Sequence, residues 1–378
     1  MRPARLPLPT WAEVALLPLV NIALAFLVVG VIVTIIGVDP FHALRLLVTG
    51  ALGSRESIGY TLYYATNFIF TGLAVSIAFH ARMFNIGGEG QAMIGGLGVA
   101  LVCMYVPWPH WSLALLGGTV AAALFGAAWA AIPAFLQAKR GSHIVITTIM
   151  FNFIAASLMT YLLVNVLIKP GQQSPESREF GANAFLPAAH ELFAKIGITF
   201  SPSPLNLAFA IALLAAALVW VLVWRTRWGY ALRVAGQNQS AAVYAGISPS
   251  RIIIQAMLLS GALAGCLGLN ELLGSQHRIL IDFPSGAGFV GIAVALMGRN
   301  HPVGILVAAV LFGALAQGGS QLAFDLPKIN RDMVVVIQGL VILFCGALEN
   351  VFRTPLAKLW PGRLARSPQP SGGTPVPR

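Results

Sequence analysis

Long apolar runs separated by short polar segments repeat along the chain from Val14 to Leu348. A run of about 20 apolar residues is long enough for a helix to cross the hydrocarbon core of a bilayer, and the chain offers about ten such runs. We expect spans near 14–36, 58–78, 91–106, 112–136, 143–168, 205–224, 252–270, 286–298, 303–316 and 333–352. The third, eighth and ninth are short enough to be tilted, broken or re-entrant. The pattern predicts an all-α polytopic membrane protein.

One membrane domain is therefore expected over residues 1–360, with two connections longer than ordinary turns. Residues 169–204 form a polar, Pro-rich loop on the outer face, and residues 225–251 form a loop on the inner face. Residues 361–378, "PGRLARSPQPSGGTPVPR", are rich in Pro, Gly and Ser and have nothing to bury. A segment of this composition is predicted to be a disordered tail.

Composition and charge support a membrane protein over a nucleic-acid-binding one. Of the 378 residues, 57% are hydrophobic and only 9% are charged, whereas soluble domains average roughly 25% charged residues. The net charge of +11 arises because most Lys and Arg residues fall in loops that share one side of the predicted topology. The acids, Glu271 among them, fall mostly on the other side. By the positive-inside rule both termini are predicted to be cytoplasmic, and no nucleic acid partner is needed to explain the basic charge.

The stretch "FNIGGEGQAMIGGLG", residues 84–98, places an acid and two amides in a glycine-rich break between apolar runs. Non-helical backbone at membrane depth persists only where it is buried in protein or lines a wet cavity. Asn85, Glu89 and Gln91 are therefore predicted to line a substrate pathway or to hold the broken backbone. The alternative is a cytoplasmic turn in which Glu89 pairs with Arg82 in water.

A second glycine-led break follows in "DFPSGAGFVGIAVALMGRNHPVG", residues 282–304. Corresponding breaks in two halves of a chain are typical of transporters built from an inverted repeat, with the substrate path between the halves. The predicted topology starts the two breaks from opposite faces of the membrane. The sequence therefore predicts an inverted repeat.

Asn152 is a polar residue inside a predicted span, and Phe151 precedes it. An interhelical hydrogen bond is the favoured role for Asn152, with substrate contact as the alternative. Phe153 follows it, and either Phe151 or Phe153 could stack on a base or simply pack. The seven histidines have no metal-ligand spacing, the three cysteines lie in apolar runs, and no nucleophile or paired-acid constellation is present. We therefore expect neither a metal site nor an enzyme.

The inner loop contains "NQSAAVYAGIS", which predicts a short helix. Asn238 or Ser240 can cap its start, and Gly246 can close it in a left-handed conformation. A helix this short is marginal in water, so packing against the membrane domain or a partner must hold it. A surface helix lying on the bilayer is the alternative.

Four segments resemble the permeases of ABC importers, in the branch that takes up nucleosides and simple sugars, with branched-chain amino acid and ribose permeases as more distant relatives. Three of them are "MFNIGGEGQAMIGG", "GSHIVITTIMFNFIA" and "GFVGIAVALMGRNHPVGILVAAVLFGAL", between Met83 and Leu315. The second has Ser142 and His143 where the family pattern has an Asn-Glu pair. The fourth is the inner loop, which resembles a coupling loop through Gly236, Asn238, Ala241, Ala242, Ala245, Gly246 and Ile247.

The resemblance implies a bacterial inner-membrane importer of two permease subunits, expected to be a heterodimer, with a cytoplasmic ATPase and an extracytoplasmic binding protein. ATP and Mg²⁺ would bind to the ATPase and not to this chain, which contains no GxxxxGK[ST] phosphate loop. The solute would be a nucleoside or a simple sugar. The alternative function is an ion-coupled secondary transporter of small polar solutes, with Glu89 as the ion-coupling acid.

Overall fold

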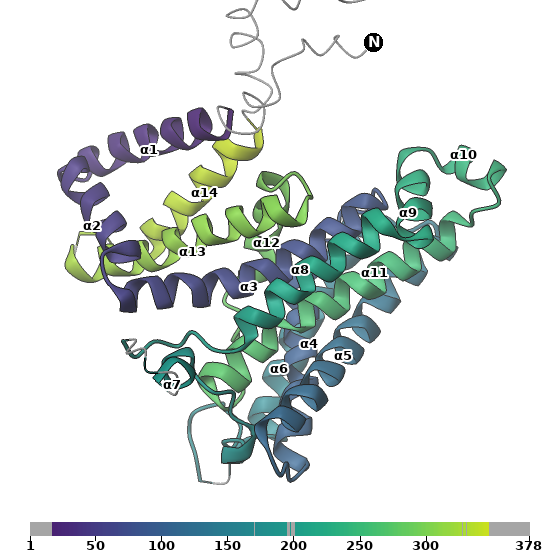
Figure 1. The fold of residues 1–378 in the computed structure, drawn as a ribbon, viewed down its shortest axis with the longest axis horizontal. Helices are drawn as coiled ribbons and strands as arrows, with labels where there is room; N and C mark the ends of the chain where they lie inside the picture. The colour runs from purple at the N-terminus through teal and green to yellow at the C-terminus, as the bar shows by residue number, and fades with distance from the viewer. Residues whose placement is uncertain are drawn as a thin grey trace, which may run out of the picture. The chain divides into compact units, whose positions relative to one another are not determined.

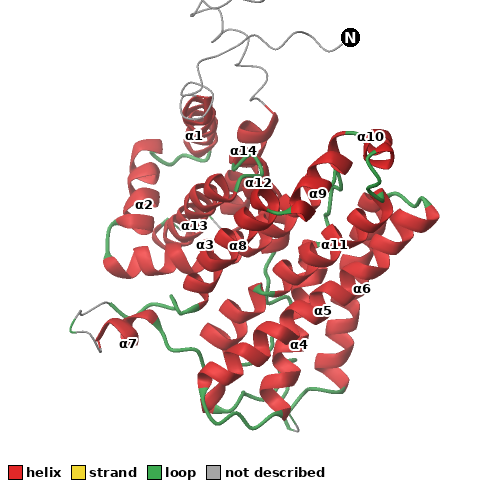
Figure 2. Ribbon diagram, turned by 45° about the vertical axis from the view of Figure 1, so that its right-hand side comes forward, coloured by secondary structure: helices red, strands yellow, loops and turns green. Residues whose placement is uncertain are grey.

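The computed structural model describes residues 17–347 except 170, 195–196, 198–200, 327 and 330. Figure 2 shows helices joined by loops, and the described residues contain no β-strand. The all-helical prediction is therefore confirmed for this part of the chain. The predicted tail, residues 361–378, lies outside the described residues.

The helices follow one another along the chain with short connections, apart from the loop between α6 and α8 (Figure 1). Their bounds are α1 Leu17–Ile35, α2 Pro40–Leu52, α3 Arg55–His80, α4 Gly88–Tyr105, α5 Trp111–Arg140, α6 Ile144–Asn165, η2 Ala182–Ala184, α7 Ala189–Ala194, α8 Ala208–Arg225, α9 Arg227–Gln237, α10 Gln239–Tyr244, α11 Pro249–Gly265, η3 Leu269–Gln276, α12 Ala287–Met297, α13 Pro302–Asp325 and α14 Arg331–Ala347. The η3 segment is a π-helix that continues α11.

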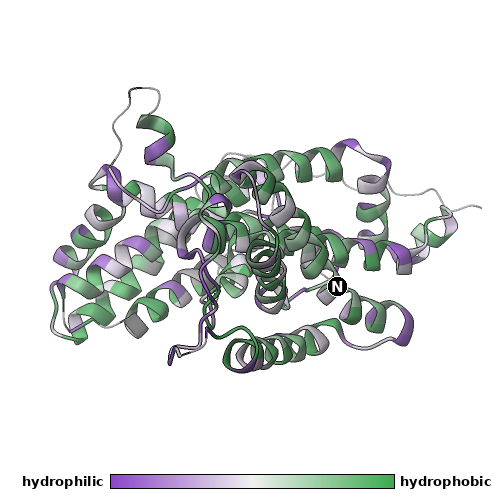
Figure 3. Ribbon diagram, turned by 90° about the horizontal axis from the view of Figure 1, so that it is seen from below, coloured by the Kyte–Doolittle hydropathy of each residue, from purple (hydrophilic) through white to green (hydrophobic). Residues whose placement is uncertain are grey.

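Six of these helical segments are long and apolar enough to cross a membrane. They are α3, α5, α6, α8, α13 and the continuous segment Pro249–Gln276. Residues Phe26–Ile35, the end of α1, and Ala287–Met297, which is α12, are shorter apolar stretches. Hydrophobic positions dominate the helical ribbon in Figure 3. The chain is thus a multi-pass membrane protein.

The chain divides into two compact units. Residues 43–334 form the larger one, which we call the core unit, and the two ends of the chain form the other. The core unit is organised around α3, which packs against α8, α11, α12 and α13. In α3 the apolar 18-residue window is 83% buried, compared with 28% in α5, α6 and α8. Helix α3 is therefore interior, whereas these three helices leave one face open.

Glycines let α4, α5 and α11 approach one another backbone to backbone. A Cβ atom on Gly95 would lie 2.2 Å from the Cα of Gly265, and one on Gly126 would lie 2.2 Å from the carbonyl oxygen of Gly261. Small residues at helix contacts allow this close packing in membranes. The three helices form one tightly packed layer, into which Ala122 also fits.

The structure corrects the predicted elements in two places. The ninth span is not short, because α13 continues from Pro302 to Asp325 through polar and glycine residues that ended the apolar run. Gly318 within it packs against Leu47 of α2, whose carbonyl oxygen would be 2.2 Å from an added Cβ. Helix α2 itself was not predicted, since its apolar residues occupy only one face of a 13-residue helix.

Candidate functional site

The first break lies between the end of α3 and the start of α4, and polar side chains hold it inside the core unit. Asn85 donates from Nδ2 to Oε1 of Gln91 and to Oγ of Ser260, both at 2.9 Å. Its Oδ1 accepts from the backbone N–H of Gly87 at 2.9 Å. Ser260 in turn donates to the carbonyl oxygen of Ala74 on α3. Asn85 and Gln91 are each only 1% exposed.

Asn152 on α6 fixes the same break from the other side. Its Oδ1 accepts from the backbone N–H of Gly90, and its Nδ2 donates to the carbonyl oxygen of Ile86, both at 2.9 Å. The amide therefore bonds to backbone within the break and in the first turn of α4. Phe151 points elsewhere, because it packs edge-on against Trp129 of α5 with ring centroids 5.3 Å apart.

Glu89 connects the first break to the second. Its two carboxylate oxygens accept hydrogen bonds from the backbone N–H groups of Gly286 at 2.8 Å and Gly288 at 2.7 Å. These donors belong to the first turn of α12. Glu89 is 4% exposed, so the alternative of an exposed turn with Glu89 paired to Arg82 is wrong.

The two breaks meet within the core unit. A Cβ atom on Gly288 would lie 2.3 Å from the backbone nitrogen of Glu89, so the first turns of α4 and α12 are in direct contact. Both helices present the positive end of their dipole at this point, and the carboxylate of Glu89 lies where it can offset both. We call Asn85, Glu89, Gln91, Asn152 and the two helix starts the break junction.

A second buried polar network lies between α3, η3 and the start of α8. Asn67 donates to Oε1 of Glu271, and Gln276 donates to Oε2 of Glu271 at 2.9 Å. Asn270 donates to Oδ1 of Asn67 at 2.8 Å and accepts from Nδ2 of Asn206 at 3.0 Å. A π-helix at a polar cluster is a frequent mark of a functional segment.

The sequence prediction missed this network and counted Glu271 among the charges of an outer loop. In the structure Glu271 is 7% exposed and belongs to the continuous segment Pro249–Gln276. The Asn-Glu pair at 270–271 interrupts the apolar run, so the predicted span ended at residue 270, six residues before the end of the segment at Gln276. The polar residue Asn67 inside another apolar run was the signal that pointed to a partner.

The loop between α6 and α8 is bound to η3 and to the residue that follows it. The backbone N–H of Phe180 donates to the carbonyl oxygen of His277 at 2.8 Å, and that of Leu186 donates to the carbonyl oxygen of Leu273 at 2.9 Å. The ring of Phe185 stacks on His277 with centroids 3.7 Å apart. Burial under this loop lowers the pKa of His277.

The inner loop contains the short helix that the sequence predicted. Asn238 caps α10 by accepting from the backbone N–H of Ala241 at 3.1 Å, and Gly246 closes it with a φ of +73°. Ala242 is fully buried, whereas Tyr244 is 94% exposed. Figure 1 shows α10 at the margin of the core unit, beyond α9.

The other residues predicted to couple this loop to an ATPase hold the loop against the rest of the core unit. Gly236 lies at the end of α9 directly on the end of α3, where an added Cβ would be 2.0 Å from the carbonyl oxygen of His80. The N–H of Ala245 donates to the carbonyl oxygen of Ala241, and that of Ile247 donates to Ala242. The structure thus gathers the predicted set in one exposed helical loop.

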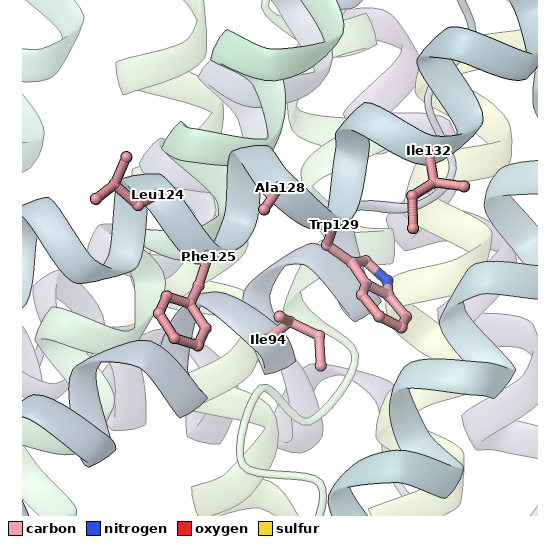
Figure 4. A pocket seen from close by; sticks show the side chains of 6 residues that line it. All are labelled: Ile94, Leu124, Phe125, Ala128, Trp129 and Ile132. Atoms are coloured by element: carbon pink, nitrogen blue, oxygen red, sulfur yellow. The ribbon is translucent and has the colours of Figure 1, made fainter.

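An apolar pocket of about 520 Å³ lies on α5 and α4 (Figure 4). Its lining is Ile94, Leu124, Phe125, Ala128, Trp129 and Ile132. The one polar atom of these side chains, the indole nitrogen of Trp129, donates to the carbonyl oxygen of Phe151 at 3.3 Å. The pocket therefore offers no polar group to a hydroxyl-rich solute. No group of three His, Cys, Asp or Glu side chains that could hold a metal occurs among the described residues.

Comparisons with known proteins identify the family. The family described as "Branched-chain amino acid transport system / permease component" matches residues 57–346. The chain is 34% identical to the guanosine ABC transporter permease protein NupP of Bacillus subtilis, over 88% of this chain and 93% of that protein. It is 34% identical to the glucose ABC transporter permease protein TsgB13 of Haloferax volcanii, over 90% and 89% of the two chains.

The nucleoside ABC transporter permease protein NupB of Lactococcus lactis subsp. cremoris is 32% identical over 91% of this chain and 93% of its own length. No solved structure matches the chain. These matches extend over nearly all of the core unit, including both breaks and the inner loop. The chain therefore belongs to the branched-chain amino acid transport system permease family, and it is a membrane-spanning permease subunit of an ABC importer, not an enzyme.

Proposed function

We propose that this permease forms half of the membrane pathway for a neutral nucleoside in the plasma membrane of a bacterium. The observation that carries the proposal is the identity of 34% and 32% to guanosine and nucleoside permeases over about nine tenths of the chain. The break junction agrees with an uncharged solute, because its only acid, Glu89, is already bonded to two backbone N–H groups. A glucose permease of equal identity keeps a simple sugar as the second candidate.

The proposed complex contains a second, different permease. Lactococcus lactis subsp. cremoris has two nucleoside permeases that match this chain, NupB and NupC, at 32% and 29% identity. An extracytoplasmic binding protein would deliver the solute to the outer face, where residues 169–204 are expected to lie. ATP and Mg²⁺ would bind to a separate cytoplasmic ATPase.

In this proposal α10 is the coupling helix that docks on the ATPase. Its buried residue, Ala242, faces the membrane domain, and its exposed residues, Val243 and Tyr244, are free for a partner. An aromatic side chain projecting from a short helix is a typical anchor for a pocket on another protein. The coupling loop then transmits the closing of the ATPase through α9 and Gly236 to the end of α3.

The topology that accompanies the proposal has about ten spans, an inverted repeat and both termini in the cytoplasm, in agreement with the charge bias of the loops. Labelling a Tyr244→Cys variant in intact cells and in inverted vesicles tests the side of the inner loop. Reaction from the cell exterior would exclude the coupling role.

Uptake in proteoliposomes tests the function. The permease is reconstituted with its second permease, ATPase and binding protein, and entry of radiolabelled guanosine and glucose is measured with and without ATP. We expect ATP-dependent guanosine entry. Entry driven by a proton or sodium gradient without ATP would favour a secondary transporter. Entry of glucose but not of guanosine would identify the transported solute as a simple sugar.

A further inference from the structure

Helix α6 leaves one face uncovered in the core unit, and that face carries polar groups. Phe153, Ser157, Thr160 and Tyr161 are exposed and lie on one side of the helix at spacings of three and four residues. Phe153 is 64% exposed and Tyr161 is 59% exposed. We call these four residues the α6 stripe.

The open faces of α5 and α8 can be compared with that of α6, because the 18-residue apolar windows of these three helices are each 28% buried. On α5 every exposed residue between Leu113 and Phe135 is apolar, and so is every exposed residue of α8 between Ala210 and Val221. Such faces suit lipid chains. The open face of α6 also carries exposed apolar residues, among them Met150, Ile154 and Leu158, but it differs from the faces of α5 and α8 in presenting the hydroxyl groups of the stripe.

The α6 stripe extends deeper along the helix than a belt of aromatic residues at the membrane surface would. Tyr161 alone, one turn from the end of α6 at Asn165, would fit the belt of aromatic residues at a membrane surface. Ser157 lies four residues further in, about 6 Å deeper at 1.5 Å per residue, and Phe153 lies about 6 Å deeper again. The stripe therefore extends toward the middle of the span.

The hydroxyl groups of the stripe are not equally satisfied within the chain. The hydroxyl of Thr160 donates to the carbonyl oxygen of Ala156 at 2.9 Å. Because this bond satisfies the hydroxyl within the helix, Thr160 could face lipid. The hydroxyls of Ser157 and Tyr161 make no hydrogen bond to the described residues. A hydroxyl without a partner in hydrocarbon is costly, so water, a solute or another protein at this face would stabilise these two groups.

We infer that the α6 stripe lines the solute pathway and contacts a neutral solute that combines a flat ring with hydroxyl groups. Phe153 offers an uncharged aromatic face for the ring, and Ser157 and Tyr161 offer donors and acceptors for ribose hydroxyls. The stripe has no charge, which suits a neutral solute that must leave again. The inference rests on the proposed function. It assigns solute contact to neighbours of Phe151 and Asn152, because Phe151 itself packs against Trp129 and Asn152 bonds to the backbone of the break junction.

Cysteine accessibility in the assembled transporter tests the inference. Ser157→Cys and Thr160→Cys are placed in a variant without the three native cysteines, and Val120→Cys on α5 and Leu214→Cys on α8 are the matched controls, with exposures of 51% and 58%. Every variant that still assembles with the second permease and the ATPase is labelled with a charged, water-soluble thiol reagent, and its guanosine uptake is recorded separately. We expect labelling at 157 and 160, loss of that labelling in saturating guanosine, and no labelling at 120 and 214.

Labelling at 157 no faster than at 214 would show a lipid-facing stripe and overturn the inference. Labelling that guanosine leaves unchanged would show a wet face without solute contact, and a cross-link from 157 to the second permease without labelling would show a protein interface. Both overturn it as well. Because the cysteine-free parent complex must first transport guanosine, these outcomes are distinct from failure of the proposed function, which would appear as absent uptake in that parent.

Discussion

The carboxylate of Glu89 accepts a hydrogen bond of 2.7 Å from the backbone N–H of Gly288, a residue 199 positions further along the chain. The bond joins the starts of α4 and α12, the two helices that follow the glycine-rich breaks. A side chain on one helix thus satisfies the otherwise unpaired N–H groups of the other. The finding explains why an acid is present in so apolar a region.

Replacing Gly288 with alanine tests the contact between these helix starts. The added Cβ would lie 2.3 Å from the backbone nitrogen of Glu89 and 2.6 Å from the carbonyl carbon of Gly88, and neither backbone atom can move independently. We expect Gly288→Ala to reduce the amount of folded protein in the membrane and to abolish uptake. Gly181→Ala is the matched control, since nothing lies within 4 Å of its added Cβ. Equal yields for the two variants would contradict the contact.

Replacing Glu89 with glutamine tests the charge. The amide can accept only one of the two N–H groups and presents its own donors to the other, and the negative charge between two helix starts is lost. We expect Glu89→Gln to lower the free energy of unfolding by about 2 kcal/mol, typical of hydrogen bonds to a charged group. Unfolding in detergent provides the measurement.

Glu176→Gln is the control for that loss. Glu176 pairs with Arg278 at 3.0 Å where the arginine side chain is 43% exposed, and an exposed pair contributes under about 1 kcal/mol. A Glu89→Gln variant as stable as Glu176→Gln would show that the carboxylate is not needed in the break junction.

The sequence predicted the local features of the site better than the distant ones. The cap of α10 by Asn238 and its closure at Gly246 follow from residue types a few positions apart, and both are present in the structure. The bond between Glu89 and Gly288 depends on how two remote breaks pack, which no local pattern encodes. Glu271 was misplaced for the same reason, since the network that makes its burial tolerable comes from α3 and α8.

Two variants of α10 separate folding of the loop from docking. Ala242→Asp puts a charge at a fully buried position and should unseat α10 from the membrane domain, abolishing uptake. Tyr244→Ala removes an exposed anchor and should leave the permease as stable as the parent while weakening its co-purification with the ATPase. Retained ATPase binding by Tyr244→Ala, measured by affinity purification in detergent, would remove Tyr244 from the proposed contact.

Asn67→Leu tests the buried network around Glu271. The variant removes the donor to Oε1 of a carboxylate that is 7% exposed and also the acceptor of Asn270. We expect a loss of about 2–3 kcal/mol in the free energy of unfolding, because a charged group is left short of a partner in the interior. Asn165→Leu, an exposed asparagine whose side chain bonds only to a backbone carbonyl of its own helix, should lose far less.

The contact between His277 and the loop that joins α6 to α8 should respond to pH. Burial lowers the pKa of this histidine, so the folded protein resists a proton that the unfolded chain accepts below about pH 6.5. Its contribution to stability is therefore present at neutral pH and is lost as the pH falls below that value. We expect the thermal midpoint of the parent protein to drop between pH 7.5 and 5.5 more than that of His277→Asn. Asparagine suits the positive φ of +54° at this position, and equal drops would contradict the assignment.

The backbone-to-backbone packing of α4, α5 and α11 restricts how the protein can move. Where Gly95 meets Gly265 and Gly126 meets Gly261, no side chain lies between the helices that could change rotamer and let them slide, although the ring of Phe125 packs against Gly98 elsewhere between α4 and α5. Transport must then carry the three helices together as one rigid body. The hinges of the alternating cycle are to be sought at its margins, in the connections that lead to α6 and α12.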